Sequence, residues 1–402
     1  MTDWAEGAAF EPGALIAPLG FVDFFRDHWE RRPLHLPRGD PGYYDRVLTN
    51  ADLDSIISSA DLRYPAIQLA RNGSYLPAEA YTKNIKHGSE SFNGVPDIRQ
   101  IQSEYRSGAT VVLPALQRTW APLRQLCAAL EDRLSHPVHA NAYLTPGDSP
   151  GFTPHYDTHE VFVLQIAGTK RWRVFPPSRP LPHRSQPFSP IGFNLPPLLL
   201  ELELRPGDLL YLPRGYVHAA HTSRGHSAHV TIGITVYTWV ELIAELAGSA
   251  KDVPALRAAL PAGFTTRAEL KETLRQNLTQ CLDLLRSNAD VDRLIEGFLQ
   301  KIKSARNAPE ISFNSDARVI GLQTLLRTPD AGSYCISTDQ HGVVMEFAGK
   351  KFILPEKIRA TIDDMCRRQS FRPMDLSSPL GDEGKLTLVR YLYGERFLAL
   401  AD

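Results

Sequence analysis

Cysteine is scarce in this chain of 402 residues, and its four cysteines, Cys127, Cys281, Cys335 and Cys366, lie far apart. Their spacing excludes the Cys-x-x-Cys pairs of a structural zinc site, and their number excludes a disulfide-stapled scaffold. Isolated thiols are typical of a reducing compartment. We therefore expect a cytoplasmic protein.

Net charge and long apolar runs are also lacking. The 44 Lys and Arg residues nearly balance the 45 Asp and Glu residues, for a net charge of -1, so no global field attracts nucleic acid or an anionic membrane. No stretch approaches the roughly 20 apolar residues of a membrane span, and the N-terminus lacks the basic and apolar segments of a signal peptide. We expect no membrane association.

Short β-rich runs fill residues 137–240, each bounded by glycine, proline or polar turns. They predict an all-β block of barrel or sandwich type. Before this block, residues 15–140 predict mixed helices with irregular connections, including a helix over 120–135. The runs are 139–145, 160–166, 170–175, 198–204, 208–213 and 229–237.

Leucine-rich stripes at helical spacing follow the β block, over residues 270–285 and 291–302. After a polar hinge at 303–312, short strands and helices predict a small α+β module of winged-helix type. The chain therefore divides into three predicted parts, residues 1–240, 241–306 and 307–402.

The sharpest chemical signal is the segment Pro-His-Tyr-Asp-Thr-His-Glu at residues 154–160. If it lies in a strand, alternation places His155 and Asp157 on one face, where both side chains can bind one metal ion. A turn near Gly215 would present His218 as the third ligand. Two histidines and one carboxylate form the facial triad of non-haem Fe(II) oxygenases, which leaves coordination positions open.

Lys170 begins the run 170–175, in which alternation places Lys170, Trp172 and Val174 on one face. If that face is internal, the buried ammonium needs an anionic partner, and the distal carboxylate of a dicarboxylic acid would serve. The alternative is that Lys170 lies at a strand end in water.

Taken together, these segments resemble a known family. Residues 141–175, 211–223 and 229–233, together with the upstream phrases 24–38 and 105–116, are similar to the JmjC-type cupin oxygenases of the ribosomal oxygenase group. The resemblance covers nearly the whole chain. It implies an α+β protein: a double-stranded β-helix (the cupin or JmjC jelly roll), a helical dimerisation bundle and a C-terminal winged-helix-like domain.

The resemblance also implies roles for residues of the β block. His155, Asp157 and His218 would bind Fe(II), and Lys170 would pair with the co-substrate 2-oxoglutarate. Further pocket residues carried over from the family are Asn141, Tyr143, Thr231 and His229. The chain departs from the family at Gly233, where the eukaryotic members have a serine, so one polar contact of the pocket is in question.

Other residues have weaker functional interpretations. His159 shares the expected face of the metal ligands and is assigned to the pocket rim, with a surface histidine as the alternative. Arg71 is a candidate for the substrate channel, although a surface arginine is the simpler interpretation. The basic stretch 170–184 either rings the barrel mouth or is a solvated loop. The acidic residues in the helix after Pro355 argue against direct DNA binding.

The function implied by the resemblance is hydroxylation of a protein side chain, a His or Arg of a large-subunit ribosomal protein, by a homodimeric enzyme. One alternative is a hydroxylase that tailors a peptide natural-product precursor. Another is a non-enzymatic cupin binding module. The complete set of His155, Asp157, His218 and Lys170 argues against the last, since a scaffold does not need it.

Overall fold

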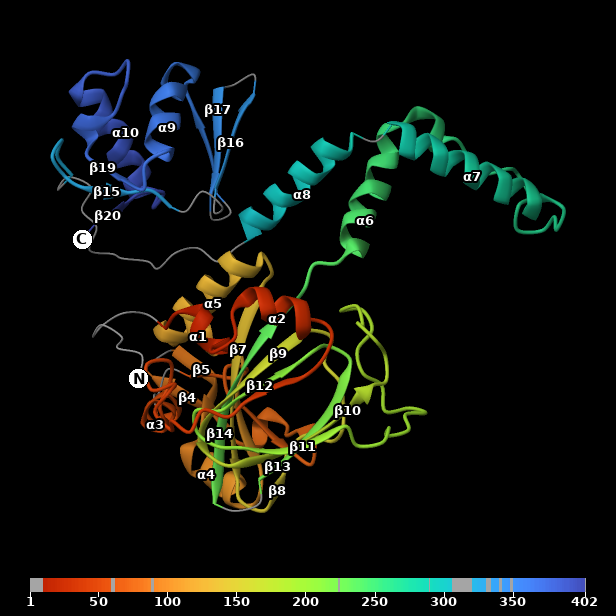
Figure 1. Ribbon diagram of the computed structural model, residues 1–402, viewed down its shortest axis with the longest axis vertical. Coiled ribbons are helices and arrows are strands. Elements are labelled where there is room, and N and C mark those ends of the chain that lie inside the picture. Colours follow the sequence, from red (N-terminus) through yellow and green to blue (C-terminus); the bar gives the residue numbers. More distant parts are fainter. Residues whose placement is uncertain are drawn as a thin grey trace. The chain divides into compact units, whose positions relative to one another are not determined.

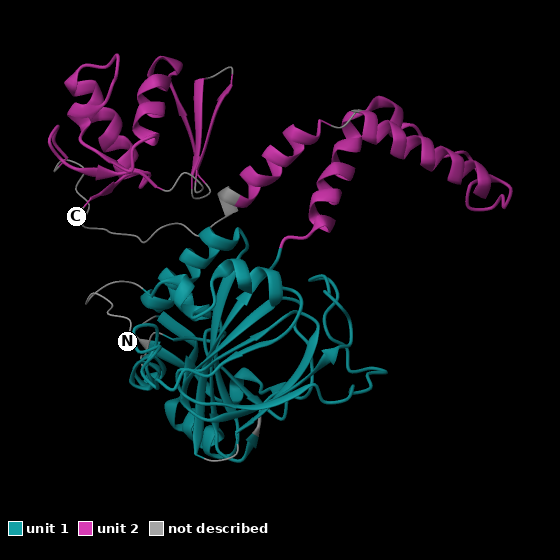
Figure 2. Ribbon diagram, viewed as in Figure 1, with its two compact units in different colours: residues 1–236 teal, residues 237–402 magenta. Residues whose placement is uncertain are grey.

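The computed structural model describes residues 10–58, 62–87, 90–222, 225–288, 290–305, 320–329, 334–339, 342–347 and 350–401. The chain forms two compact units, residues 1–236 and 237–402 (Figure 2). Most of the hinge predicted at 303–312 lies outside the described residues. No helix among the described residues is long and apolar enough to cross a bilayer.

Two antiparallel sheets build the first unit (Figure 1). The large sheet has the order β1 (Leu34–Leu36), β12 (Leu209–Leu212), β9 (Glu160–Gly168), β14 (His226–Ile234), β7 (Val138–Pro146), β6 (Thr110–Leu113), β2 (Gln68–Arg71), β3 (Ser74–Tyr75). The small sheet has the order β11 (Leu200–Leu204), β10 (Lys170–Pro177), β13 (Tyr216–Thr222), β8 (Ser149–Pro150). This architecture confirms the predicted all-β block.

Strand β7 shows how the large sheet separates two environments. Its even-numbered residues, from Val138 to Leu144, belong to the main hydrophobic core, which also contains the leucine stripe of α5 (Ala121–Leu134). Because side chains alternate along a strand, the odd-numbered residues face the opposite side. That side faces the space between the sheets, where Val163, Trp172 and Leu212 pack together.

Helices and a hairpin complete the first unit. The predicted helix over 120–135 is confirmed as α5. Residues 15–140 also contribute strands, which the prediction of mixed helices there omitted. These strands are two to seven residues long, too short to show a clear period, and several form by pairing with distant strands. The other elements are α1 (Pro12–Ile16), α2 (Phe21–Asp27), α3 (Asn50–Ser58), α4 (Ile98–Arg106) and the hairpin β4 (Thr82–His87) and β5 (Glu90–Pro96).

The second unit begins with helices, as the leucine stripes predicted, and ends in a small α+β part with its own hydrophobic core. The helices are α6 (Trp239–Ser249), α7 (Leu270–Asn288) and α8 (Val291–Ala305). The α+β part contains β15 (Leu326–Arg327), β16 (Tyr334–Asp339), β17 (Gly342–Phe347), β18 (Lys350–Leu354), α9 (Arg359–Cys366), β19 (Ser370–Phe371), α10 (Asp382–Gly394) and β20 (Ala399–Leu400).

Candidate metal centre and active site

Backbone hydrogen bonds join the two segments that carry the predicted metal ligands. His155 N–H donates to the His218 carbonyl (3.2 Å), and His218 N–H donates to the His155 carbonyl (2.8 Å). Gly215 N–H donates to the carbonyl of Asp157 at 3.0 Å. Segments about 60 residues apart in sequence are thus held together at the positions where the side chains must converge.

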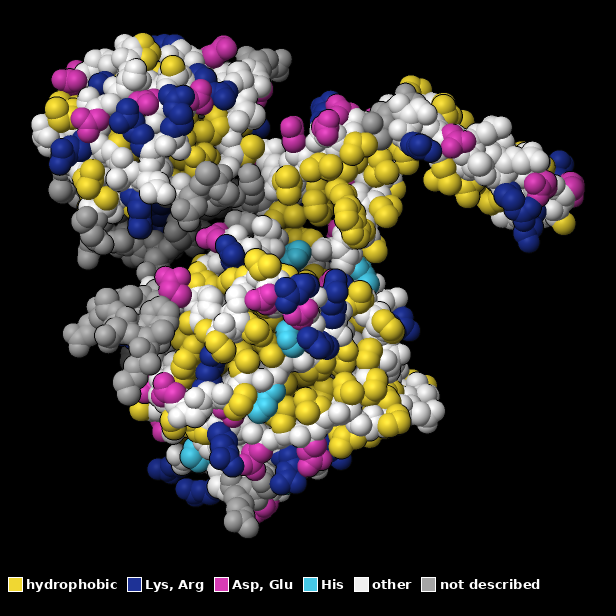
Figure 3. Space-filling view, viewed as in Figure 1, with side chains coloured by type: hydrophobic (Ala, Val, Ile, Leu, Met, Phe, Trp, Pro, Cys, Tyr) yellow, Lys and Arg dark blue, Asp and Glu magenta, His cyan; other side chains and the backbone are white. Residues whose placement is uncertain are grey.

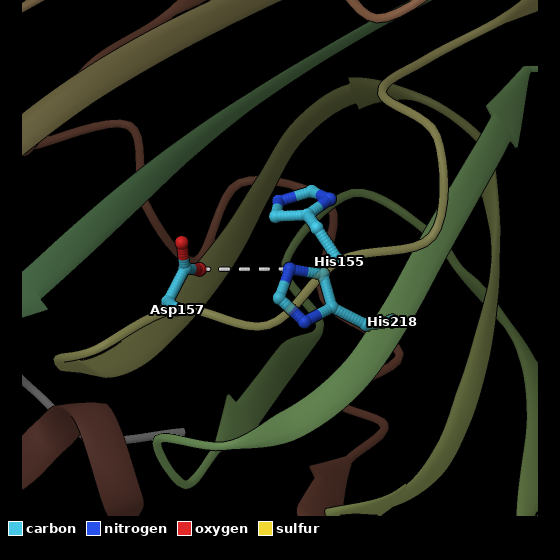
Figure 4. Close-up of side chains that lie close together, drawn as sticks. All are labelled: His155, Asp157 and His218. Carbon is cyan, nitrogen blue, oxygen red and sulfur yellow. Dashed lines mark ion pairs between the residues drawn. The ribbon is translucent and has the colours of Figure 1, made fainter. Parts of the chain in front are cut away.

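The three side chains meet at one point. One donor atom from each of His155, Asp157 and His218 lies within 4.8 Å of the other two. His218 Nε2 lies 3.5 Å from Asp157 Oδ2, and the two imidazole rings are 4.6 Å apart between centroids (Figure 4). Such a cluster of two imidazoles and one carboxylate matches the donor set of a facial-triad metal site.

Hydrogen bonds orient both imidazoles for metal binding. His155 Nδ1 lies 2.7 Å from the Thr153 carbonyl, and His218 Nδ1 lies 3.1 Å from the Tyr216 carbonyl. A carbonyl oxygen can only accept, so Nδ1 carries the proton in each ring and Nε2 keeps its lone pair. Fixing the second ring nitrogen in this way is the usual support for a metal-binding histidine. The residues therefore fit a divalent metal ion.

The protonation states suit the same role. Burial first, and then the neighbouring His155, lower the pKa of His218 to about 4, so this imidazole is neutral at physiological pH. Burial acts to raise the pKa of Asp157, but the surrounding imidazoles, His159 first, outweigh it and the net shift is downward. A neutral imidazole and an ionised carboxylate are the forms that bind metal ions.

The three candidate metal ligands lie in a cavity of about 300 Å³ between the two sheets. The predicted pocket residues Asn141, Tyr143, Thr231 and His229 line it together with Lys170. The other lining residues are Tyr75, Thr110, Gly151, Phe152, His155, Asp157, His159, Val161, Val163, Trp172, Leu212, His218, Ala219 and Ala220.

Lys170 is buried, with only 3% of its surface exposed. This contradicts the alternative that it lies at a strand end in water. Its Nζ donates to Thr145 Oγ1 at 3.0 Å, and no acidic side chain pairs with it among the described residues. Burial lowers the pKa of the Lys170 ammonium to about 7. An ammonium in the cavity that lacks a carboxylate partner is suited to bind an anionic ligand.

Two cross-strand pairs of β7 and β14 line the cavity. Tyr143 is opposite His229, with the rings stacked at 4.9 Å between centroids, and Asn141 is opposite Thr231. The next pair on the same face, His139 and Gly233, is not among the lining residues. Neither His139 nor Thr145 was predicted from the sequence, although both share the alternation of Asn141 and Tyr143. Tyr75 and Phe152, which line the cavity, were also not predicted, and the sequence gives no comparable signal for them.

Apart from Lys170, the basic candidates of the sequence do not line the cavity. Arg71 is not among the cavity residues, because its guanidinium forms an ion pair with Glu104. Of the basic residues in 170–184, only Lys170 lines the cavity, and Arg171 and Arg173 lie on the exposed face of β10. Alternation along that strand, which buries Lys170 and Trp172, necessarily turns these arginines outward.

The local geometry around two ligands also differs from the prediction. His155 and Asp157 do not lie in a regular strand; they precede β9, and only His155 forms an isolated bridge with His218. His218 lies in strand β13, whereas the sequence predicted that a turn near Gly215 presents this residue. His221 and His226 lie in β13 and β14, where both are exposed.

Comparison with known proteins gives consistent matches. Residues 116–242 match the JmjC domain family. The chain is 32% identical over 301 residues to ribosomal oxygenase 1 of Gallus gallus, a match that covers 72% of this chain and 46% of the relative. It is 29% identical over 373 residues to the bifunctional lysine-specific demethylase and histidyl-hydroxylase NO66 of Drosophila persimilis, a match that covers 87% of this chain and 51% of the relative. The chain therefore spans about half the length of these curated relatives.

Among solved structures, the ribosomal oxygenase YcfD of Escherichia coli has a similar fold. One structure superposes with a TM-score of 0.53 at 18% identity and covers 95% of this chain and 98% of YcfD. Another, in complex with cobalt and 2-oxoglutarate, has a TM-score of 0.54 at 16% identity and covers 96% of this chain and 99% of YcfD. Residues 116–242 therefore form a JmjC domain, and the chain is similar to ribosomal oxygenases over 72% of its length.

Proposed function

We propose that this protein is an Fe(II)- and 2-oxoglutarate-dependent oxygenase that hydroxylates a side chain of another protein. One observation carries the proposal: the convergence of His155, Asp157 and His218 beside the buried Lys170 in one cavity. The names of the relatives support the same activity. YcfD, whose fold is similar, has been crystallised with cobalt and 2-oxoglutarate.

His155, Asp157 and His218 would hold the iron. When bound, the iron supplies activation of dioxygen at coordination positions that the three protein ligands leave open. The protein's contribution is orientation: the carbonyls of Thr153 and Tyr216 fix the two imidazoles, and the cavity walls restrict access by water.

Lys170 would pair with the distal carboxylate of 2-oxoglutarate, supported by Thr145. Asn141, Tyr143 and Thr231 would complete the co-substrate pocket. The Oδ1 atom of Asn141 already accepts a hydrogen bond from Ala115 N–H at 2.9 Å, so its amide group remains as a donor.

The substrate would be a protein side chain, a His or Arg of a large-subunit ribosomal protein, with His229 close to its binding position. The relatives called ribosomal oxygenases support this choice. The alternative function is the hydroxylation of a peptide natural-product precursor. A purely structural cupin is disfavoured, because a buried ammonium without a carboxylate partner is costly for a scaffold.

For the second unit we propose a homodimer formed through α6–α8. Hydrophobic side chains gather along α6 and α8 (Figure 3), and Trp239, Ile243, Leu278 and Leu282 are all more than half exposed. Exposed apolar stripes of this kind usually meet a partner surface.

The C-terminal part would be winged-helix-like, an interpretation supported by the small sheet β16–β18 beside α9 and α10. Direct DNA binding is not part of the proposal, because Arg359 and Arg368 of this part are paired with Asp363 and Asp364.

A cytoplasmic location stays a prediction, with which the four free cysteines agree.

Metal binding and turnover test the proposal first. The purified chain should bind one Mn(II), a stable substitute for Fe(II), measured by calorimetry. His155→Ala, Asp157→Ala and His218→Ala should lose this binding and the Fe(II)-dependent conversion of 2-oxoglutarate to succinate. The matched control is His221→Ala, an exposed histidine of the same strand as His218, which should behave as the unmodified chain. Full turnover in any of the three variants would remove that residue from the metal site.

The substrate is tested in cells with and without the gene. Intact-mass spectra of the ribosomal proteins should show one large-subunit protein that is about 16 Da heavier, the mass of one oxygen atom, only when the gene is intact. Complementation with Asp157→Ala should not restore the shift. Identical spectra would contradict the ribosomal substrate and bring the peptide-tailoring alternative to first place.

A further inference from the structure

A buried arginine directly precedes the glycine that supports a candidate metal ligand. Gly215 N–H donates to the Asp157 carbonyl at 3.0 Å, and Arg214, the residue before it, is only 6% exposed. A guanidinium group stays charged at all physiological pH values, so its burial is costly unless acceptors surround it. Arg214 is not among the residues that line the cavity, so any effect that it has on the metal centre is indirect.

The Arg214 side chain joins three segments that are distant in sequence. Its Nη2 donates to the carboxylate of Glu30, which follows α2, and its Nη1 donates at 3.1 Å to the Pro182 carbonyl in the connection between β10 and β11. Its Nε lies 3.4 Å from Oε1 of Glu160, the first residue of β9 and the third after Asp157. Burial raises the pKa of Glu160 to about 7, so the partly exposed Glu30 is the main counter-ion of Arg214.

Two tyrosines hold the same part of the chain on either side of Gly215. The hydroxyl of Tyr211 accepts from the N–H of Glu30 at 3.0 Å. The hydroxyl of Tyr216 donates to the Arg31 carbonyl at 2.6 Å. Together with the guanidinium, these bonds hold the main chain before and after Gly215 against the segment that follows α2. The N–H group that supports the metal-binding segment therefore has a fixed position.

Asp157 depends on such support more than the two candidate histidine ligands do. It lies outside the regular strands, whereas His218 is part of β13 and His155 forms a bridge with His218. Metal-ligand bonds tolerate errors of only about 0.2 Å, so a segment that samples other positions binds the ion with a lower apparent affinity. Fixing the main chain of Asp157 thus favours metal binding.

We propose that Arg214 is a positioning residue of the metal centre: it fixes Gly215, and through the Gly215 N–H it holds Asp157 at the position that a metal ion needs. This inference rests on the proposed metal centre and gives a physical cause for its geometry. Lysine at position 214 would keep the charge but lose the planar fork of donors, which reaches Glu30 and Pro182 at the same time.

A Co(II) titration of the full chain tests this role, because the visible absorption of bound Co(II) reports both occupancy and ligand geometry. The absorption that is missing in Asp157→Ala is assigned to the metal centre. Arg214→Lys should bind Co(II) at that centre about tenfold more weakly and with a shifted absorption band, as is typical when the support behind a metal ligand is lost. Arg173→Lys, at an exposed arginine of β10, is the matched control and should behave as the unmodified chain.

Glu30→Gln is a second and milder variant, because Glu30 is partly exposed and an amide oxygen can still accept a hydrogen bond. It should weaken Co(II) binding roughly threefold, since a neutral acceptor replaces a charged one. Combined with Arg214→Lys, the loss should be smaller than the product of about thirtyfold, because both substitutions break the same contact. Glu201→Gln, in the exposed ion pair with Arg171, is the control and should leave Co(II) binding unchanged.

Thermal unfolding of the metal-free variants shows whether they are folded at the temperature of the titration. A lower melting temperature with unchanged Co(II) affinity and absorption would make Arg214 a purely structural residue and overturn the inference, as would full additivity of the two substitutions. If Arg214→Lys does not fold, Glu30→Gln decides alone, and unchanged Co(II) binding in that variant overturns the inference. If the unmodified chain shows no Co(II) absorption that depends on Asp157, the proposed metal centre itself fails.

Discussion

A single buried lysine defines the electrostatics of the cavity. Lys170 donates to the hydroxyl of Thr145. His229 lies in the same cavity, and its burial, together with the charge of Lys170, holds its pKa well below the usual value. An ammonium with a pKa near 7 is partly neutral at physiological pH. A bound carboxylate favours the charged form, so ligand binding and proton uptake are coupled at this residue.

Binding of 2-oxoglutarate to the Mn(II)-loaded chain should therefore take up protons above pH 7. At pH 6 Lys170 is already charged and uptake is close to zero, whereas at pH 8.5 uptake approaches one proton. The affinity should fall by up to about tenfold per pH unit above 7. Calorimetry in two buffers of different ionisation enthalpy measures the uptake. Lys170→Arg, with its permanent charge, is the control and should show no uptake from this site. Equal uptake in both proteins would contradict the assignment.

Another residue-scale constraint is the absence of a side chain at Gly233. Gly233→Ala should destabilise the protein by about 1–3 kcal/mol, because the new Cβ overlaps the buried ring of His139. Urea denaturation measures the change. Gly13→Ala is the control, since a Cβ there meets no atom within 4 Å. Adding His139→Ala to Gly233→Ala should recover part of the loss; an additive effect of the two substitutions would show that the residues do not compete for space.

At the scale of elements, the connection between β10 and β11 is tied to the metal-binding segment. Residues 178–199 expose several apolar side chains, with Ile191 90% exposed. Tyr156, between the two ligands His155 and Asp157, is buried against Phe188 and donates from its hydroxyl to the Gln186 carbonyl at 3.1 Å. The connection is therefore anchored at the residue that separates the two ligands.

Tyr156→Phe keeps the ring contact and removes the hydrogen bond, so it should loosen this connection without emptying the metal site. One lost hydrogen bond of about 1 kcal/mol corresponds to roughly a fivefold higher open population. Tryptic cleavage after Arg184, followed by mass spectrometry, should accelerate by this factor. Tyr64→Phe, at a half-exposed tyrosine, is the matched control. Equal cleavage rates in the two variants would mean that the Tyr156 hydroxyl does not hold the connection.

At the scale of the whole molecule, the apolar surface of α6–α8 determines the expected assembly. The chain should have the mass of a dimer by light scattering at micromolar concentration. Leu278→Glu combined with Leu282→Glu, two exposed leucines one turn apart on α7, should give monomers, because charges in an apolar interface are costly. Val22→Glu, at an exposed position of α2, is the control and should stay dimeric. A monomer mass for the unmodified chain would contradict the proposed dimer.

Local patterns in the sequence determined much of this protein. Runs of alternating or apolar residues bounded by glycine and proline predicted six strands of the two sheets, and the leucine stripes predicted α5, α7 and α8. Alternation along 170–175 also predicted that Lys170 and Trp172 share one face, and that face is buried in the structure. These features depend on residues close together in sequence, so the periodicity of apolar side chains is sufficient to predict them.

Contacts between distant segments were decided only by the tertiary structure. The β13 strand that carries His218 forms by pairing with β10, and the partner of Arg71 is Glu104 on another element. The placement of His139 over Gly233, about 90 residues apart in sequence, follows from the β7–β14 register. A shift of one residue in such a register would turn every side chain to the other face, and no local period records which strand lies opposite.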